Sequence, residues 1–166
     1  MDDFEELRAI LQDDDVMYAW EYTFSDDDVR NWINKNLELY EKYNLGYFII
    51  IDKSTDKISG QAALMPDTIN DRRYYEISYI LKKNCWHKGY ATEAASALAL
   101  YAFNVLDIEE IIFEIRPNNF SSRKVAERLN AKEAGKFTKD VRGTKVPHLI
   151  YRLDKNALTS NFCKKF

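Results

Sequence analysis

The stretch Trp86-His87-Lys88-Gly89-Tyr90-Ala91-Thr92-Glu93-Ala94 decides the fold of this chain. Residues 74–81 before it are mostly aromatic and aliphatic and predict a strand, whereas an alanine- and leucine-rich helical pattern runs from about Gly89 to Val105. A bend between a strand and a helix directs several backbone N–H groups to one place, and the helix N-terminus adds partial positive charge. Such a bend suits a phosphate group. The same residues are also compatible with a plain connection that uses a glycine to turn.

The elements around this bend mix strands and helices along the whole chain. Two helices are expected before it, over 3–12 and from Ser25, where Asp28 has the spacing of a capping box. A loop is expected over 66–73, and the tail 154–166 has no strong pattern. The expected strands and the remaining helix are 47–51 and 58–65 (a hairpin), 74–81, 108–115, about 133–139 and about 147–153, with a helix over 119–130. This order predicts an α+β (mixed α/β) fold.

Length and composition favour one folded domain. The chain has 166 residues, of which 46% are hydrophobic and 31% are charged. We expect a single domain over 1–166, with a core from about 3 to 153 and a C-terminal tail over 154–166. The net charge of -3 argues against nucleic acid as a main partner, because phosphate binding needs a basic surface.

Cysteine and histidine usage argues against a zinc site of the usual kind. Cys85 and Cys163 lie far apart, and the only histidines are His87 and His148, so we expect no metal and two reduced thiols in a cytoplasmic protein. The acidic N-terminus does not read as a signal peptide, and no apolar run approaches the ~20 residues that span a bilayer. We therefore expect no membrane partner.

A second motif, Arg116-Pro117-Asn118-Asn119-Phe120-Ser121-Ser122, accompanies the bend. Together the two motifs resemble the GNAT superfamily of N-acetyltransferases. Gly89 and Ala91 match the two small positions of the family's pyrophosphate loop, Gln/Arg-x-x-Gly-x-Gly/Ala, while Asn119 and Ser122 match its Asn-x-x-Ser. The form Trp-x-Lys-Gly-Tyr-Ala-Thr-Glu-Ala resembles the branch of the ribosomal-protein N-terminal acetyltransferases, the Rim type.

Several positions depart from the family pattern. Trp86 stands at the opening polar position of the loop, and Asn130-Ala131 replaces the usual Gly-Phe after the later helix. Ala126 stands where many relatives carry a tyrosine that serves as general acid. The strand that usually opens the family fold is expected to be missing, since the first pattern along the chain is a helix.

The resemblance implies a fold and a cosubstrate. The family's central, mostly antiparallel sheet splays between its fourth and fifth strands, here about 74–81 and 108–115, and acetyl-CoA binds in that opening. Unpaired backbone groups near Ile80 and Leu81 would bind the pantetheine arm, and an N–H near Ile80 would polarise the thioester carbonyl. Lys88 either adds charge or is simply solvated. The expected acetyl-CoA-binding residues are Ile80, Leu81, His87, Lys88, Gly89, Tyr90, Ala91, Thr92, Asn119 and Ser122.

The implied chemistry is direct attack of a primary amine on the thioester. A protonated amine must lose a proton, and Glu76 is the first candidate for the base, matching a glutamate that some relatives use. The alternative is a solvent-facing residue or a salt-bridge partner. Ser122 is expected to orient or stabilise the leaving thiolate; its alternative is an ordinary first-turn residue of a helix.

The acidic runs 13–15 and 26–28 are the residues that bear on the acceptor amine. In the family, the first two helices form one side of the acceptor site. An acidic rim would attract a cationic amine such as a peptide N-terminus, a polyamine or an aminoglycoside. The alternative is a solvated face whose acids suit a helix start. Relatives are often monomers or homodimers.

Two further interpretations stay open besides an N-acetyltransferase. One is a non-catalytic module that binds acyl-CoA without turnover, which Ala126 and the missing strand favour. The other is a structural domain with a chance match.

Overall fold

The computed structural model describes residues 3–20 and 22–162, with side chains of the last helix up to Leu158. Its contacts divide the chain into two compact units. The first comprises residues 1–65 and 79–94, and the second comprises 66–78 and 95–166. The single domain expected over 1–166 stays a prediction.

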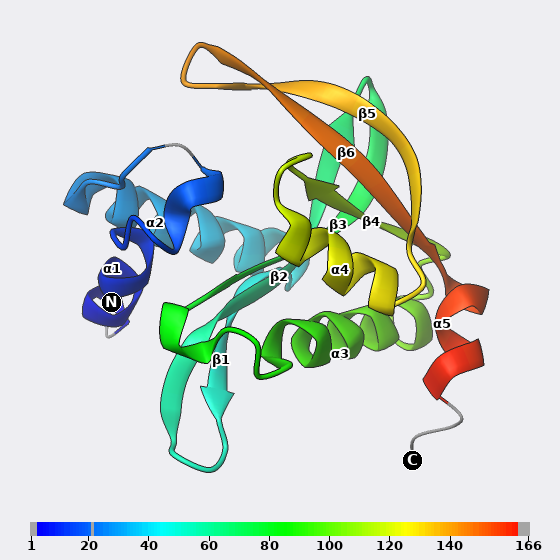
Figure 1. Cartoon of the computed structure of the whole chain (residues 1–166), viewed down its shortest axis with the longest axis horizontal. Coiled ribbons are helices and arrows are strands. Elements are labelled where there is room, and N and C mark those ends of the chain that lie inside the picture. The colour runs from blue at the N-terminus through cyan, green and yellow to red at the C-terminus, as the bar shows by residue number, and fades with distance from the viewer. Residues whose placement is uncertain (1–2, 21, 163–166) are drawn as a thin grey trace. The chain divides into compact units, whose positions relative to one another are not determined.

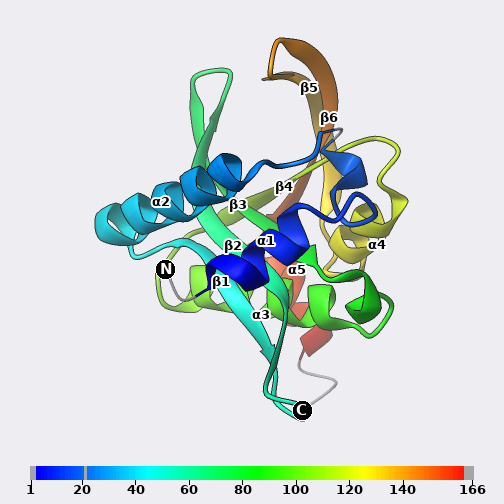
Figure 2. The ribbon, with the colours of Figure 1, turned by 90° about the vertical axis from the view of Figure 1, so that its left-hand side faces the viewer.

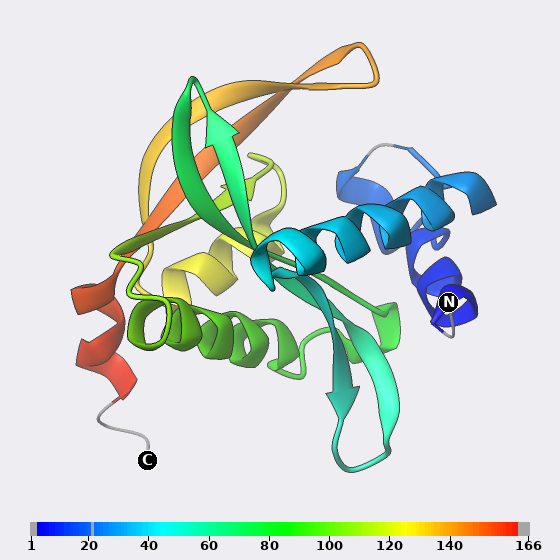
Figure 3. The same ribbon diagram turned by 180° about the vertical axis from the view of Figure 1, so that it is seen from behind.

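The first unit opens with two helices, α1 (Phe4–Leu11) and α2 (Asp26–Tyr43), separated by a short 3-10 helix, η1 (Met17–Ala19) (Figure 3). The predicted capping box at the start of α2 is confirmed. Ser25 Oγ accepts from the Asp28 N–H at 3.2 Å, and Asp28 Oδ2 accepts from the Ser25 N–H at 2.9 Å. The box satisfies two backbone donors that the helix start leaves without partners.

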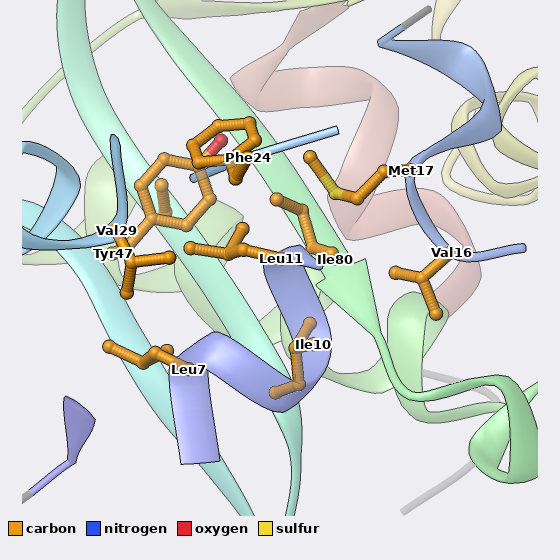
Figure 4. Packing of buried hydrophobic residues seen from close by; sticks show 10 residues of the cluster. Leu7, Ile10, Leu11, Val16, Met17, Phe24, Val29, Tyr47 and Ile80 are labelled. Atoms are coloured by element: carbon orange, nitrogen blue, oxygen red, sulfur yellow. The ribbon is translucent and has the colours of Figure 1, made fainter. Parts of the chain in front are cut away.

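The core of the first unit forms where α1 and α2 meet the strands (Figure 4). Ile10, Leu11 and Val29 are fully buried there. Trp32 packs its ring against Tyr47 and Phe24, with ring centroids 4.6 and 5.8 Å apart. Phe24 belongs to this core, whereas Tyr18 is 49% exposed.

Strands β1 (Gly46–Asp52) and β2 (Lys57–Ile69) form the predicted hairpin, but the loop expected over 66–73 is wrong. β2 continues to Ile69 and β3 (Arg72–Leu81) begins three residues later. Asn70 and Asp71 both have left-handed backbones, with φ of 49° and 63°, as a two-residue type I′ turn requires. The β1 partners of β2 end at Leu64, so the missing N–H of Pro66 costs the pairing with β1 no hydrogen bond.

The sheet has six strands in the order β1-β2-β3-β4-β6-β5, with β4 (Glu110–Ile115), β5 (Lys132–Val141) and β6 (Thr144–Asp154). β6 pairs antiparallel with both β4 and β5, whereas β3 pairs parallel with β4 through Glu76 and Ile112. The α+β class and an open, mostly antiparallel sheet are thus confirmed. The tips of the β2–β3 and β5–β6 hairpins extend in the same direction (Figures 1 and 2).

Within residues 3–20 and 22–162, the first element is α1, and the expected absence of the family's opening strand stays a prediction. The predicted helices correspond to α3 (Tyr90–Asn104) and α4 (Phe120–Arg128). A short 3-10 helix, η2 (Lys83–Cys85), leads into the bend. None of the described helices combines the length and the apolar character needed to cross a bilayer.

The featureless tail expected over 154–166 is wrong for its first part, because Lys155–Phe162 form helix α5. Leu158 is only 1% exposed, and Asn130 Nδ2 donates to the Ala157 carbonyl at 3.0 Å. Lys155 Nζ lies 3.0 Å from Asp107 Oδ1. α5 therefore lies beside the C-terminal end of α3, as Figures 1 and 3 show. Tertiary contacts stabilise this helix. The sequence therefore shows no helical repeat of apolar residues that would have predicted it.

Candidate active site

The bend before α3 has the backbone that its glycine predicts. His87 and Gly89 have positive φ values, 60° and 89°, and a Cβ added to Gly89 would meet no atom within 4 Å. The first helical bond of α3 runs from the Glu93 N–H to the Gly89 carbonyl at 3.0 Å. The N–H groups of a helix's first turn have no acceptor within the helix. Open space, backbone donors and the helix dipole therefore fit a diphosphate at this position.

The predicted pyrophosphate-binding residues follow one another across this bend. His87, Lys88 and Gly89 are exposed, whereas Tyr90 and Ala91 are half-buried. Exposure before the helix and partial burial within its first turn leave one face of the bend accessible. The predicted role of these residues and of half-buried Thr92 in binding stays a prediction.

Tyr90 fixes the start of α3 to the end of β1. Its hydroxyl donates to Asp52 Oδ2 at 2.6 Å. Hydrogen bonds from Ser54 and from Tyr90 lower the pKa of Asp52 to about 2, and the same bond to Asp52 raises the pKa of Tyr90. Asp52 is therefore ionised at neutral pH, and Tyr90 holds its proton. The side chain of Tyr90 positions the bend, and only its backbone is left for a ligand.

Trp86 corrects part of the expectation for the end of β3. Its Nε1 donates to the Leu81 carbonyl at 3.0 Å, so that carbonyl is not unpaired as predicted. The indole takes this place because tryptophan replaces the usual polar residue, and its ring meets Tyr18 edge-on at 6.4 Å. Leu81 is 9% exposed and Ile80 is 5% exposed. The role predicted for the Ile80 backbone stays a prediction.

Ile80 also explains Gly60. A Cβ built on Gly60 would lie 2.3 Å from the Ile80 carbonyl oxygen and 2.8 Å from Leu81 Cα. The Lys82 N–H donates to the Ser59 carbonyl at 2.9 Å, so the two strands approach closely here. Glycine at position 60 lets β2 lie this close to the end of β3.

In the second unit, Glu76 is a buried member of a cluster of charged groups that extends to the surface. It is 6% exposed, so the solvent-facing alternative is wrong. Oxygens of Asp67, Glu76 and Glu114 all lie within 4.8 Å of one another. Lys139 Nζ lies 2.8 Å from Glu114 Oε2 and 3.4 Å from Asp67 Oδ2. Three carboxylates and one ammonium thus share one face of the sheet.

Burial and mutual repulsion keep protons in this cluster. Burial raises the pKa of Glu76 well above its ordinary value, Glu114 and Asp67 add to the rise, and Lys139 opposes it. Burial likewise raises the pKa of Glu114 to about 7 against the pull of Lys139. Glu114 Oε1 is among the buried atoms of the described side chains that receive no hydrogen bond. A proton held by Glu114 relieves this, since Glu114 then donates to Asp67.

Asp67, Glu114 and Lys139 were not predicted from the sequence. Glu114 carries a signal, because it interrupts the apolar run Ile111-Ile112-Phe113 and Ile115 in a strand. A carboxylate in such a run is buried and needs a partner. Asp67 lies in the stretch that was expected to be a loop, and Lys139 lies among polar residues of an exposed strand. Neither residue therefore carries a sequence signal of its burial or its partners.

The predicted pair Asn119 and Ser122 begins α4. Asn119 Oδ1 accepts from the Ser122 N–H at 3.1 Å, and Asn119 is the N-cap of the helix. This contact gives the Asn-x-x-Ser spacing a structural role, as in other helix caps. The predicted roles of the Asn119 and Ser122 side chains toward acetyl-CoA stay predictions. Ala126, in the place of the family's tyrosine, is fully buried.

The six aspartates expected to form an acidic rim are all engaged within the chain. Their contacts include Asp13 with the Asp15 N–H, Asp14 with Thr23, Asp15 with Lys83, Asp26 with Gln12, Asp27 with Arg30 and Asp28 with Ser25. Lys83 and Arg30 balance the charges of Asp15 and Asp27, whereas the neutral donors leave the charges of their own aspartate partners in place. These contacts give both acidic runs structural roles, and the attraction of a cationic amine stays a prediction.

Known proteins resemble this chain in sequence and in fold. The chain is 30% identical over 142 residues to the uncharacterized protein YkkB of Bacillus subtilis, covering 86% of this chain and 80% of that protein. A crystal structure of a GNAT-family acetyltransferase from Bacillus anthracis superposes with a TM-score of 0.78 at 25% identity, covering 93% of this chain and 90% of that one.

A spermidine N-acetyltransferase from Vibrio cholerae, solved in complex with CoA and spermine, shares the fold. Its TM-score is 0.75 at 16% identity, with 95% of this chain and 93% of that chain covered. The family model of the acetyltransferase (GNAT) domain matches residues 1–132 of this sequence. On these findings, the chain belongs to the GNAT acetyltransferase family.

Proposed function

We propose that this protein is an N-acetyltransferase that transfers the acetyl group of acetyl-CoA to a primary amine by direct attack. The observation that carries the proposal is the bend at Gly89, with its left-handed backbone, open space and helix start. Those features suit the diphosphate of coenzyme A, and a GNAT relative has been solved with CoA bound. Membership of the Rim-type branch is part of the proposal.

Each part of the chain has one task in the proposed reaction. Backbone N–H groups from His87 to Thr92 hold the diphosphate, and the backbone near Ile80 polarises the thioester carbonyl. Glu76 takes a proton from the protonated amine, whose neutral nitrogen then bonds to the carbonyl carbon while the carbon–sulfur bond breaks. The sulfur leaves as a thiolate, which Ser122 stabilises by hydrogen bonding and which accepts the second proton of the nitrogen to become the free thiol.

The acceptor is a primary amine, either a protein N-terminus or a small molecule. The likeness to a spermidine N-acetyltransferase adds polyamines to the compounds worth testing, at the level of fold alone. We also propose that the protein works in the cytoplasm as a monomer or homodimer, without nucleic acid, membrane or metal.

The test combines binding and turnover. Acetyl-CoA should raise the melting temperature, because a ligand at 100 times its Kd adds about 2.7 kcal/mol to the free energy of unfolding. Free thiol should appear with at least one member of a panel of peptide N-termini, polyamines and aminoglycosides. A thermal shift with no thiol release from any amine would indicate the acyl-CoA-binding module instead. No shift would contradict both.

The binding module remains the second candidate because of one observation. Ala126 is fully buried in α4 and offers no proton to a leaving thiolate. Buried Glu76 favours turnover over the module, because a carboxylate kept from water costs stability and an idle module has no use for a base.

A further inference from the structure

Lys139 carries the ammonium of the buried cluster, and no motif of the sequence points to it. It lies on β5, opposite Val146 of β6, and its side chain is 45% exposed. Its Nζ reaches back to Glu114 of β4 and Asp67 of β2. The side chain of Glu114 is only 3% exposed. A cation from the edge strand of the sheet thus reaches one buried carboxylate, Glu114, and one half-buried carboxylate, Asp67.

The carboxylate of Glu76 lies close to the two carboxylates that contact Lys139. Glu76 pairs with Ile112 across β3 and β4, and Glu114 lies two residues further along β4, on the same face. The negative charges of Asp67 and Glu114 disfavour the ionised form of Glu76. The positive charge of Lys139 favours that ionised form. Burial acts to lower the pKa of Lys139, but the charges of Glu114 and Glu76 outweigh burial, and the pKa of Lys139 is raised. The lysine is therefore charged whenever Glu76 acts.

The remaining charged groups near Lys139 come from β6 and the end of β4. Burial lowers the pKa of His148, and the charges of Lys139 and Arg116 act in the same direction. His148 is thus neutral at neutral pH, and its ring lies tilted against Phe137 at 5.6 Å. The ammonium of Lys139 is in direct contact with two carboxylates of the cluster, those of Glu114 and Asp67.

We infer that Lys139 is a positioning residue for Glu76: its ammonium holds Glu114 in place and makes the ionised form of Glu76 accessible to the reaction. This inference rests on the proposed function, in which Glu76 is the base. Lys139 itself touches no reacting atom. It acts through the charge balance of the buried carboxylates.

The direct test is a titration of the glutamate carboxyl carbons by 13C NMR, with Glu76 assigned by its absence in Glu76→Gln. Lys139→Gln removes the cation and should move the midpoint of Glu76 upward by about one pH unit or more. Glu114→Gln removes a like charge and should move it downward. Lys139→Arg keeps the charge and should retain the wild-type midpoint. Lys136→Gln, an exposed lysine whose side chain leaves the opposite face of β5, is the matched control.

The same variants are then followed by thiol release as a function of pH, with one amine throughout. Lys139→Gln should shift the rising limb of kcat/KM upward and lower kcat at neutral pH about tenfold, with KM for acetyl-CoA unchanged. Lys139→Arg should restore the wild-type profile, which also covers the case in which Lys139→Gln does not fold.

Failure of the two proposals can be told apart. Wild-type protein that releases no thiol contradicts the proposed function, while the NMR titration still reports on the cluster. A Glu76 midpoint that Lys139→Gln leaves in place overturns the inference. So does a midpoint that moves while the kinetic limb stays, because Lys139 would then set the charge of a residue the reaction does not use.

Discussion

The hydroxyl of Tyr90 and the carboxylate of Asp52 lie 2.6 Å apart, which joins the first turn of α3 to the last residue of β1. Tyr90 belongs to the loop motif, so the motif's tyrosine has a mechanical task in this chain. It holds the bend at Gly89 against the hairpin. The geometry offered to a diphosphate therefore depends on a residue 38 positions earlier in the sequence.

Tyr90→Phe removes this bond and keeps the ring. We expect acetyl-CoA to bind about fivefold more weakly, because one hydrogen bond to a charged group no longer restrains the bend. Isothermal titration calorimetry measures the change. Tyr101→Phe, on the same helix with an exposed ring, is the control and should bind like wild type. Equal affinity of the Tyr90 and Tyr101 variants would show that the bend holds its shape unaided.

Asp52 predicts a response to acid. Because its folded pKa is lowered to about 2, it stabilises the fold above its ordinary pKa, and this contribution is lost as the pH falls through about 2. Asp52→Asn removes the titrating group. Its melting temperature should therefore approach that of wild type as the solution is acidified from neutral pH. A constant difference at every pH would contradict the assignment.

Gly89 is expected to matter for the ligand more than for the fold. Gly89→Ala forces a side chain into a left-handed backbone, at a cost of about 1–2 kcal/mol, and places a Cβ in the space proposed for the diphosphate. Gly143, in the turn between β5 and β6, has a φ of 83° and equally open surroundings. Gly143→Ala should thus lower the melting temperature similarly and leave acetyl-CoA binding intact. Loss of binding in both variants would trace the effect to stability alone.

Gly60 is expected to matter for the fold. Gly60→Ala places a Cβ 2.3 Å from the Ile80 carbonyl oxygen, and the strands must move apart to admit it. We expect a loss of about 1–3 kcal/mol in the free energy of unfolding, as for other overpacked sites. Urea denaturation measures it. Gly135→Ala, on β5 with nothing within 4 Å of the added Cβ, should change stability by a much smaller amount.

Glu114 predicts a loss of stability toward alkaline pH. Its folded pKa, about 7, lies above the ordinary 4.5, so its contribution is fully present below pH 4.5 and is lost as the pH rises through about 7. Relative to Glu114→Gln, wild type should lose about 3 kcal/mol across this range. Urea denaturation at several pH values tests this.

Glu109→Gln is the control for that series, because its side chain is 77% exposed. A Glu114→Gln variant whose difference from wild type stays constant with pH would mean that Glu114 ionises in the fold as it does in water.

Local chemistry predicted the parts of the fold that depend on neighbouring residues. The spacing of Ser25 and Asp28 predicted the start of α2, and the bend at Gly89 predicted the start of α3. The loop expected over 66–73 did not include a two-residue turn at Asn70-Asp71 between two long strands. Pro66 costs the pairing with β1 no hydrogen bond because the β1 partners stop two residues earlier, which is a tertiary fact.

The candidate site divides in the same way. Glu76 was identified through its family position, but its burial and its dependence on Lys139 come from strands that are distant in sequence. The hydrogen bond from the Trp86 indole to the Leu81 carbonyl likewise depends on the folded shape of the bend, which the sequence alone does not show. Residues that act through a neighbour far along the chain leave no pattern in their own surroundings.

Helix α5 has a practical consequence for making this protein. The side chain of Leu158 is buried, and the Ala157 carbonyl accepts a hydrogen bond from the side-chain amide of Asn130. A shortened version ending with β6, at Asp154, would remove this buried side chain and leave the Asn130 amide without that acceptor. Crystallisation and labelling work should therefore keep the polypeptide intact through Leu158 and attach any C-terminal tag beyond it.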